Sequence, residues 1–291
     1  MRYRQSLQIG IIFIIISELL FTSMAAIIKL LSTDLPTESL VFFRNFFVVL
    51  ILLPWILRHG TTKINSQPFR FHLVRSLSGV GAMYCFFYIY AHLPLAEAVL
   101  FRMTVPFFIP IICAWWLGEA VPMQIRWAIL IGFFGVVVIL KLGMVTFSPV
   151  VLIALMGSLL AALAKSAIRR MSDTEASIHI VFYFSFISML VSVVPLWWAW
   201  VTPTWQEYAL LLLIAILATV AQLLMTQAYQ RAPAAQIGPF GYVSVIFAAL
   251  YGWLFWNEVI DLWFFSGGGL IIVAGFLIIQ NQKTDKINVK D

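Results

Sequence analysis

The sequence predicts an all-α integral membrane protein with ten transmembrane helices, arranged as a five-plus-five inverted repeat with both termini in the cytoplasm. The first observation behind this prediction is composition, because the 291 residues are 63% apolar and only 10% charged, with a mean hydropathy of +1.00. The second is that apolar runs of about twenty residues recur, and each can cross a hydrocarbon core about 30 Å thick. The third is a pattern that occurs twice, half a chain apart.

Ten apolar runs, separated by prolines and polar segments, are expected to form the ten helices. The polar segment 58–71 separates the second run from the third, and tight connections lie around Pro94, Pro122 and Pro233. In chain order the predicted spans are residues 8–31, 38–57, 72–91, 95–117, 123–142, 148–168, 179–200, 207–229, 234–256 and 262–280.

The first run follows Arg2 and Arg4 and could be taken for a signal peptide. It continues to Leu31, however, which is long enough to span a membrane, and its end matches a segment of the second half. It is therefore assigned as the first helix.

The Lys and Arg residues of the predicted loops fall almost entirely on one side. With the amino terminus inside, the cytoplasmic side carries twelve of them and the opposite side carries only Lys141. Because cytoplasmic loops are enriched in Lys and Arg, both termini are expected in the cytoplasm. The net charge of +6 is thereby explained by topology, and a nucleic-acid partner is not expected.

The duplicated pattern relates residues 93–119 to residues 232–258. Pro94 and Pro233 are 139 positions apart, as are Glu119 and Glu258. Five spans per half is an odd number, so the second half must enter the membrane from the opposite side. Such inverted repeats support rocking between outward-open and inward-open states around a site at the midplane. The predicted division is residues 1–143 for the first repeat, 144–282 for the second, and 283–291 for a cytoplasmic tail.

These residues resemble the EamA family of the drug/metabolite transporter superfamily along essentially the whole chain. The matching features are Lys29 and Lys165, Phe43-Arg44-Asn45, the segment 93–98, Pro106, Gly118-Glu119 and Asn257-Glu258. The resemblance implies a ten-helix carrier of the inner membrane, in a family with many exporters of amino acids and other small metabolites and fewer importers. The second half departs from the pattern, with Gln236 in place of Glu97, Val245 in place of Pro106 and Gly241 opposite Arg102.

Glu18 is the clearest candidate for a functional charge inside the membrane. It lies nine residues after Ile9, about 14 Å into the bilayer and near its midplane. Ionisable groups at this depth cost roughly 2.5–3.5 kcal/mol on insertion scales, which makes them functional candidates. Glu18 is expected to carry a coupling proton or to hold a substrate amine. The alternative is a structural pair with an arginine that locks two helices together.

Arg44 and Arg102 are expected about 9–11 Å from the outer face. Either is placed to neutralise Glu18 or to bind a substrate carboxylate in a bidentate manner. Arg44 falls at a family position that looks architectural, whereas Arg102 has no counterpart in the second half and is expected to line the cavity. Arg75 begins the third span near the cytoplasmic face, where it is expected to snorkel to water.

Two pairs of polar side chains are weaker candidates for substrate contacts. Tyr84 and Tyr88 are four residues apart and share one face of the third helix, and Gln222 and Gln227 occupy a comparable stretch of the eighth. Polar-tipped side chains of this kind suit an amphipathic solute in a mostly apolar cavity. The alternative for each is hydrogen bonding between helices.

Two spans are expected to contain weak points that act as hinges. Pro106 and Pro110 should break or kink the fourth helix about midway, leaving free carbonyl groups to line the cavity. Gly238 and Pro239 supply a comparable weak point in the ninth helix. The glycines at 267–269 are expected to allow close helix packing in the tenth.

Glu119 and Glu258 end helices, where a negative charge opposes the helix dipole. Each is therefore expected to accept hydrogen bonds from the start of a neighbouring helix, in a structural or gating role. Lys29 and Lys165 are expected to act as helix-end anchors.

Together these features predict a multi-pass secondary transporter of the inner membrane that works by alternating access and exports amino acids or related amphipathic solutes. Glu18 would supply proton coupling if transport is coupled. The expected partners are a small-molecule substrate and the lipid bilayer, with no cofactor and no metal. An enzyme is not expected, because all four histidines lie at helix ends or in loops and no Asp lies within a span.

Two alternatives remain open. One is an importer of a nutrient or cofactor-like metabolite, of the nucleoside, vitamin or S-adenosylmethionine type, that works as an exchanger. The other is a channel or a non-transporting membrane scaffold.

Overall fold

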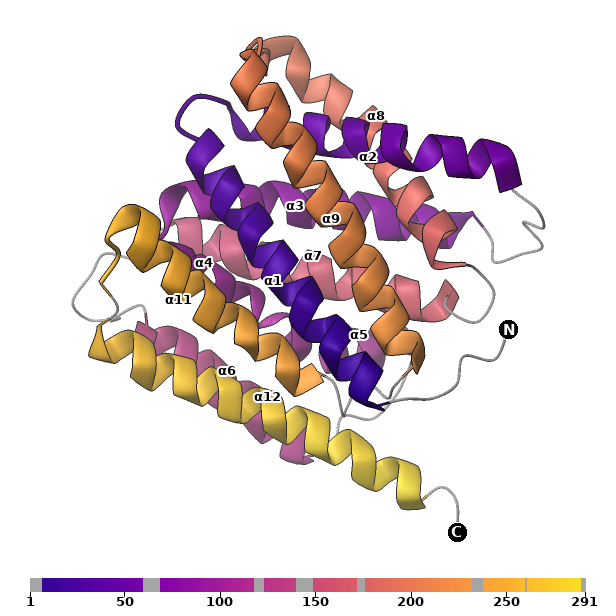
Figure 1. Ribbon diagram of the computed structural model, residues 1–291. Coiled ribbons are helices and arrows are strands. Elements are labelled where there is room, and N and C mark those ends of the chain that lie inside the picture. Colours follow the sequence, from indigo (N-terminus) through magenta and orange to yellow (C-terminus); the bar gives the residue numbers. More distant parts are fainter. Residues whose placement is uncertain are drawn as a thin grey trace.

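The computed structural model describes residues 7–59, 69–117, 123–139, 149–171, 176–231, 238–259 and 261–288, and these ranges contain helices and no strand (Figure 1). The first half holds α1 (Leu7–Leu31), α2 (Thr37–His59), α3 (Arg70–His92), α4 (Leu95–Arg102), α5 (Val105–Leu117) and α6 (Met123–Ile139). The second half holds α7 (Pro149–Met171), α8 (Ser177–Ala199), α9 (Trp205–Arg231), the 3₁₀ helix η1 (Gly238–Tyr242), α11 (Val243–Trp256) and α12 (Leu262–Asn288).

Five of the described helices are long and apolar enough to cross a membrane, namely the greater part of α1, α2, α7, α8 and α9. Shorter apolar helices occur within α6, η1–α11 and α12. The 23-residue α3 is less apolar because it carries buried polar side chains, including Arg75 and Ser78. It packs against α1, α2, α4, α7 and α8, so much of its surface faces protein.

One of the ten predicted spans is interrupted, and the described part of another begins as a 3₁₀ helix. Residues 95–117 form α4 and α5, separated by a turn at Met103 and Thr104. A proline ring clashes with the carbonyl four residues earlier, and Pro106 therefore disfavours a continuous helix through Arg102. The predicted break in this span is confirmed, although α5 continues through Pro110. In the ninth span, Gly238 and Pro239 begin η1, and residues 232–237 lie outside the described ranges.

The most extensive helix contacts join the two halves of the chain. They are α6 with α12, α3 with α7, α1 with α9 and α2 with α8. In Figure 1, α1 and α9 run side by side across the front of the molecule, and α6 lies along α12. Neither half therefore packs as a separate bundle.

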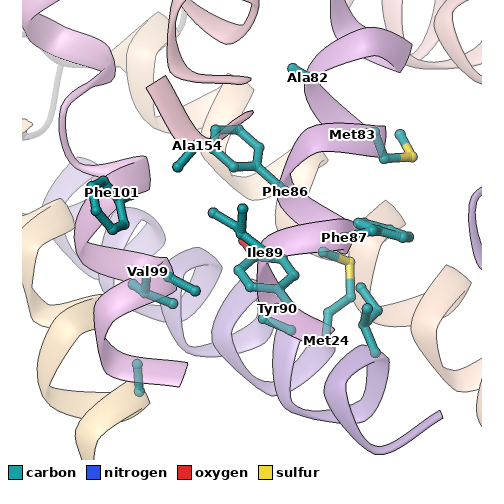
Figure 2. Packing of buried hydrophobic residues seen from close by; sticks show 14 of the residues in the cluster. Met24, Ala82, Met83, Phe86, Phe87, Ile89, Tyr90, Val99, Phe101 and Ala154 are labelled. Carbon is teal, nitrogen blue, oxygen red and sulfur yellow. The ribbon is translucent and has the colours of Figure 1, made fainter. Parts of the chain in front are cut away.

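The main core lies where α1, α3, α4 and α7 converge (Figure 2). Phe86, Phe87 and Tyr90 of α3 lie between Met24 of α1 and Ala154 of α7, and all five are buried. The Val99 and Phe101 side chains of α4 close the same cluster.

The predicted close packing of the last span is confirmed at one glycine. Gly135 of α6 lies against the backbone carbonyl of Gly267 on α12, and a Cβ atom at position 135 would come within 2.7 Å of that oxygen.

Large apolar side chains are highly exposed on the outside of the bundle, where Trp197 and Trp205 are 93% and 90% exposed. Such exposure of large apolar side chains is expected of a surface that faces lipid or its headgroups.

Candidate functional site

An ion pair between Glu18 and Arg102 lies inside the bundle. Glu18 is near the middle of α1 and only 9% exposed, and its Oε2 atom accepts a hydrogen bond from Nη2 of Arg102 at 2.6 Å. Arg102 is the last residue of α4, so the interruption of the span places its guanidinium group beside α1. Of the two arginines expected to neutralise Glu18, Arg102 does so.

The break between α4 and α5 meets the 3₁₀ helix η1 and the start of α11 at this ion pair. The hydroxyl of Ser244, in the first turn of α11, lies 3.8 Å from the sulfur of Met103, in the turn between α4 and α5. A Cβ atom added to Gly241 of η1 would lie 3.9 Å from Oε1 of Glu18. Glu18 and Arg102 therefore lie where a helix break of the first half meets a 3₁₀ segment of the second.

The carbonyl of Phe101, at the break, is fully hydrogen-bonded. It accepts from the N–H of Thr104 at 3.0 Å, from the hydroxyl of Thr104 at 2.7 Å and from the hydroxyl of Ser158, on α7, at 3.0 Å. Both hydroxyls are buried. The break is thus held in place by side chains, which satisfy the carbonyl that a continuous helix would have used.

Arg44 of α2 and Arg75 of α3 both lie against the ring of Phe184 on α8. They are 2% and 8% exposed, and their guanidinium carbons lie 5.5 Å and 3.9 Å from the centroid of the Phe184 ring. Nη1 of Arg44 donates a hydrogen bond to Oδ1 of Asn45 at 2.7 Å. The prediction that Arg75 snorkels to water is wrong, because its guanidinium group packs against Gly79, one turn further into the bundle.

Tyr84 and Tyr88 line a cavity of about 440 Å³ at the end of the bundle where α1 ends and α2 begins. The ring of His92 stacks on that of Tyr88 at a centroid distance of 4.0 Å. The remaining lining residues are Ser32, Leu35, Pro36, Thr37, Glu38, Cys85, Ala91 and Ile153. The predicted tyrosine pair therefore shares one cavity with an acid and a histidine that sequence reasoning did not single out.

Gln222 and Gln227 do not line the tyrosine cavity. Ala228, the neighbour of Gln227 on α9, packs with Ile14 in the first half of α1. Since Ile14 precedes the cavity residue Ser32 by about 27 Å of helix, the two sites lie far apart. The structure does not bring the two predicted polar pairs together.

Lys29 and Glu258 tie three helix ends together. The Lys29 ammonium lies 2.8 Å from Oε1 of Glu258 and donates to the carbonyl of Leu93 at 2.6 Å. Oε2 of Glu258 accepts from the N–H of Leu95, the first residue of α4, at 2.8 Å. This is the hydrogen bond to a neighbouring helix start that was predicted for Glu258. Its repeat counterpart Glu119 lies outside the described residues.

Lys165 is not at a helix end, so its predicted role as an end anchor is wrong. It lies inside α7, six residues before the last residue of that helix, and its side chain is exposed. Its charge interacts with those of Glu18, Arg102 and Arg75. The sequence already indicated that Lys165 lies inside the helix, because position 165 falls within the predicted span 148–168.

The comparisons with known proteins agree with this architecture. A model of the EamA-like transporter family matches residues 8–141 and again residues 148–280. The "Pseudopaline exporter CntI" of Pseudomonas aeruginosa is 32% identical over 279 residues, which cover 95% of this chain and 98% of that protein. The "S-adenosylmethionine uptake transporter" of Rickettsia bellii is 28% identical over 88% of each chain, and the "Riboflavin transporter" of Rhizobium johnstonii is 27% identical over 94% of this chain and 92% of its own.

A solved crystal structure superimposes on 92% of this chain and 95% of its own, with a TM-score of 0.66 and 18% sequence identity. At that identity the likeness shows a shared fold and nothing of substrate or direction.

Proposed function

The chain belongs to the EamA-like transporter family, and we propose that it is a secondary transporter that exports amino acids or related amphipathic solutes across the inner membrane by alternating access. In this proposal ten spans cross the membrane with both termini in the cytoplasm. Residues 1–143 and 144–282 form the two inverted repeats, and residues 283–291 form a cytoplasmic tail.

The pattern of helix contacts supports the inverted repeat. In a two-fold relation between the halves, α1 corresponds to α7, α2 to α8 and α3 to α9. The contact of α1 with α9 then has its counterpart in the contact of α7 with α3. Likewise, the contact of α2 with α9 has its counterpart in that of α8 with α3, and the contact of α2 with α8 corresponds to itself. This is the packing that a two-fold relation between the halves would produce.

The single observation that carries the transport mechanism is the ion pair of Glu18 and Arg102, where the break between α4 and α5 meets the 3₁₀ helix η1. Transporters commonly bind substrate and coupling ions near the midplane, where discontinuous helices meet. Protonation of Glu18 would release Arg102, and Arg102 would then be free to bind a solute carboxylate. This exchange of partners is a direct way to couple a proton to solute movement.

The tyrosine cavity is proposed as the outer vestibule. The positive-inside orientation puts the end of α1 and the start of α2 at the outer face. The cavity there combines aromatic rings with the polar groups of Glu38 and His92, which suits a solute with both apolar and charged parts. Lys29 and Glu258 would gate the same side, and Pro106, Pro110, Gly238 and Pro239 would provide the hinges.

Import by exchange is the second candidate. Export is favoured by the relative named as a pseudopaline exporter, and import by the relatives named as S-adenosylmethionine uptake transporters. Both directions use the same alternating-access cycle, so the direction depends on the gradients and on the coupling.

Solute counterflow in proteoliposomes tests the proposal. Purified protein is reconstituted with an internal panel of amino acids, nucleosides and vitamins, and uptake of each labelled solute is followed with and without a pH gradient. Wild type is expected to accumulate at least one solute, and Glu18→Gln is expected to keep counterflow but to lose the pH-driven component. Linear, non-saturating flux without counterflow would indicate a channel and would reject the carrier mechanism.

A further inference from the structure

We infer that Arg44 and Arg75 form a binding site, between α2, α3 and α8, for an oxyanion group of the transported solute, either a carboxylate or a phosphate. The inference rests on the proposed transport function, because the oxyanion is taken to belong to the solute. It adds to that function the chemical class of the solute and a second contact point besides Arg102.

The two guanidinium groups are buried without a counterion. Both side chains are less than 9% exposed, and the charge of Arg75 acts on Arg44 at close range. Within the described ranges, neither guanidinium forms an ion pair with a carboxylate. Arg44 donates one hydrogen bond, to the neutral side chain of Asn45, and both guanidinium groups lie against the ring of Phe184. Two like charges held together away from water are unfavourable unless an anion joins them.

Hydrogen-bond donors of the pair, and hydroxyls that follow Arg75 and Phe184 in the sequence, also lack partners. The Nε atoms of Arg44 and Arg75 are buried and make no hydrogen bond in the described part of the chain. The same holds for the hydroxyls of Ser76, which follows Arg75, and of Ser185, which follows Phe184. Buried donors without acceptors are rare, and each calls for a specific explanation. An oxyanion supplies acceptors of the number and charge that these groups need, and arginine binds oxyanions in a bidentate manner.

The direction of the Arg75 side chain indicates that its charge serves to bind a ligand and is not merely tolerated inside the protein. Arg75 lies only five residues from the start of α3, close enough to an end of the helix to reach water by snorkelling. Its guanidinium group instead packs along its own helix against Gly79, where a Cβ atom would collide with Nη1. The absence of a side chain at position 79 thus lets the charge point into the bundle.

The arginine pair adds to the positive charge of the ion pair's arginine. The interior of the described bundle holds three arginines, namely Arg44, Arg75 and Arg102, against the carboxylate of Glu18. An interior with such an excess of positive charge selects a solute with negative groups.

Thermal unfolding of the purified protein in detergent tests the site directly. The probes are sodium malonate and sodium phosphate, each compared with sodium chloride at equal ionic strength. The variants are Arg44→Gln, Arg75→Gln and Arg75→Lys, which keeps the charge but lacks the paired N–H donors. The matched control is Arg58→Gln, which removes an exposed arginine that takes no part in the site.

Wild type and Arg58→Gln are expected to gain about 2–4 °C in Tm at saturating probe over chloride. All three site variants are expected to lose this gain. Arg75→Lys keeps the positive charge, so it still tests the site if a Gln variant does not fold. A response to malonate alone assigns a carboxylate, and one to phosphate alone assigns a phosphate. No gain over chloride in wild type, or a gain that survives in folded Arg44 and Arg75 variants, would overturn the inference.

Counterflow separates this inference from the transport proposal. For a solute found to be transported, Arg75→Gln or Arg75→Lys is expected to reduce counterflow at least tenfold, while Arg58→Gln does not. If counterflow is unaffected, transport stands and the anion site is rejected. If wild type binds the probes but no solute counterflows, the protein has an oxyanion site, but the transport proposal and the assignment of the oxyanion to a transported solute are both rejected.

Discussion

The side chains of Lys29 and Glu258 meet at 2.8 Å, although 229 residues separate them along the chain. Lys29 lies in the last turn of α1 and Glu258 lies just beyond α11, so one contact joins an end of the first half to an end of the second. Both side chains are less than one-sixth exposed. The pair therefore joins the ends of α1 and α11 at this end of the bundle.

Removing one member of this pair should destabilise the protein more than removing both. We expect Lys29→Met or Glu258→Gln alone to cost about 1–3 kcal/mol, because each leaves a partly buried charge unpaired. The double variant should cost less than the sum of the two single changes. A double-mutant cycle of thermal unfolding measures this coupling, and strict additivity of the two costs would show that the pair contributes nothing.

Gly252→Ala should displace the Glu258 carboxylate. A Cβ atom at position 252 would collide with Oε2 of Glu258, and that oxygen also accepts from Leu95 N–H. We expect a loss of about 1–3 kcal/mol in unfolding free energy. Gly269→Ala is the matched control, since nothing lies within 4 Å of the added methyl group there. It should be neutral or stabilising by up to about 1 kcal/mol, because Ala is the better helix former.

Ser158→Ala should loosen the break between α4 and α5. The Ser158 hydroxyl bridges from α7 to the freed carbonyl of Phe101. Its loss should cost about 1 kcal/mol and speed amide hydrogen exchange around Thr104. Ser166→Ala is the matched control, because the Ser166 hydroxyl bonds only within its own helix, to the carbonyl of Ala162. Equal exchange at Thr104 in the two variants would show that Ser158 does not hold the break.

Glu18→Gln should be rescued in stability, but not in function, by Arg102→Gln. The single change leaves a buried arginine without its carboxylate, at a cost of about 3–5 kcal/mol. The double change removes both charges, so we expect most of that stability to return. Counterflow measured on the stable double variant then separates the two roles of the pair. Full activity there would mean that Glu18 and Arg102 only join two helices.

Much of the fold follows from features that are local in the sequence. Apolar runs predict the helices, and Pro106 predicts the break that separates α4 from α5, because a proline ring acts on its own backbone. Glu18 could be predicted to pair with an arginine, since a lone carboxylate near the midplane is costly. Which arginine pairs with Glu18 depends on the turn at Met103, and the local sequence pattern does not predict where that turn places Arg102.

The position of the Arg75 side chain could not be predicted, because tertiary contacts decide it. Arg75 turns inward where Gly79 leaves space and where Phe184 of α8 supplies a ring, 109 residues further along the chain. Lys165 lies inside a helix that continues to Met171, beyond the predicted end of its span. Similarly, Tyr88 and Gln227 match at the repeat spacing, yet of these two only Tyr88 lines the tyrosine cavity.

The pairing of helices across the two halves has a consequence for how the protein is made. When the first five spans have left the ribosome, α1, α2, α3 and α6 still lack the helices against which each packs most extensively. These segments must wait in the lipid, with Glu18 and the arginines of α2 and α3 exposed to hydrocarbon or held by the insertion machinery. The most extensive helix pairings are therefore late events that require α7, α8, α9 and α12, although α3 can already pack against α1, α2 and α4.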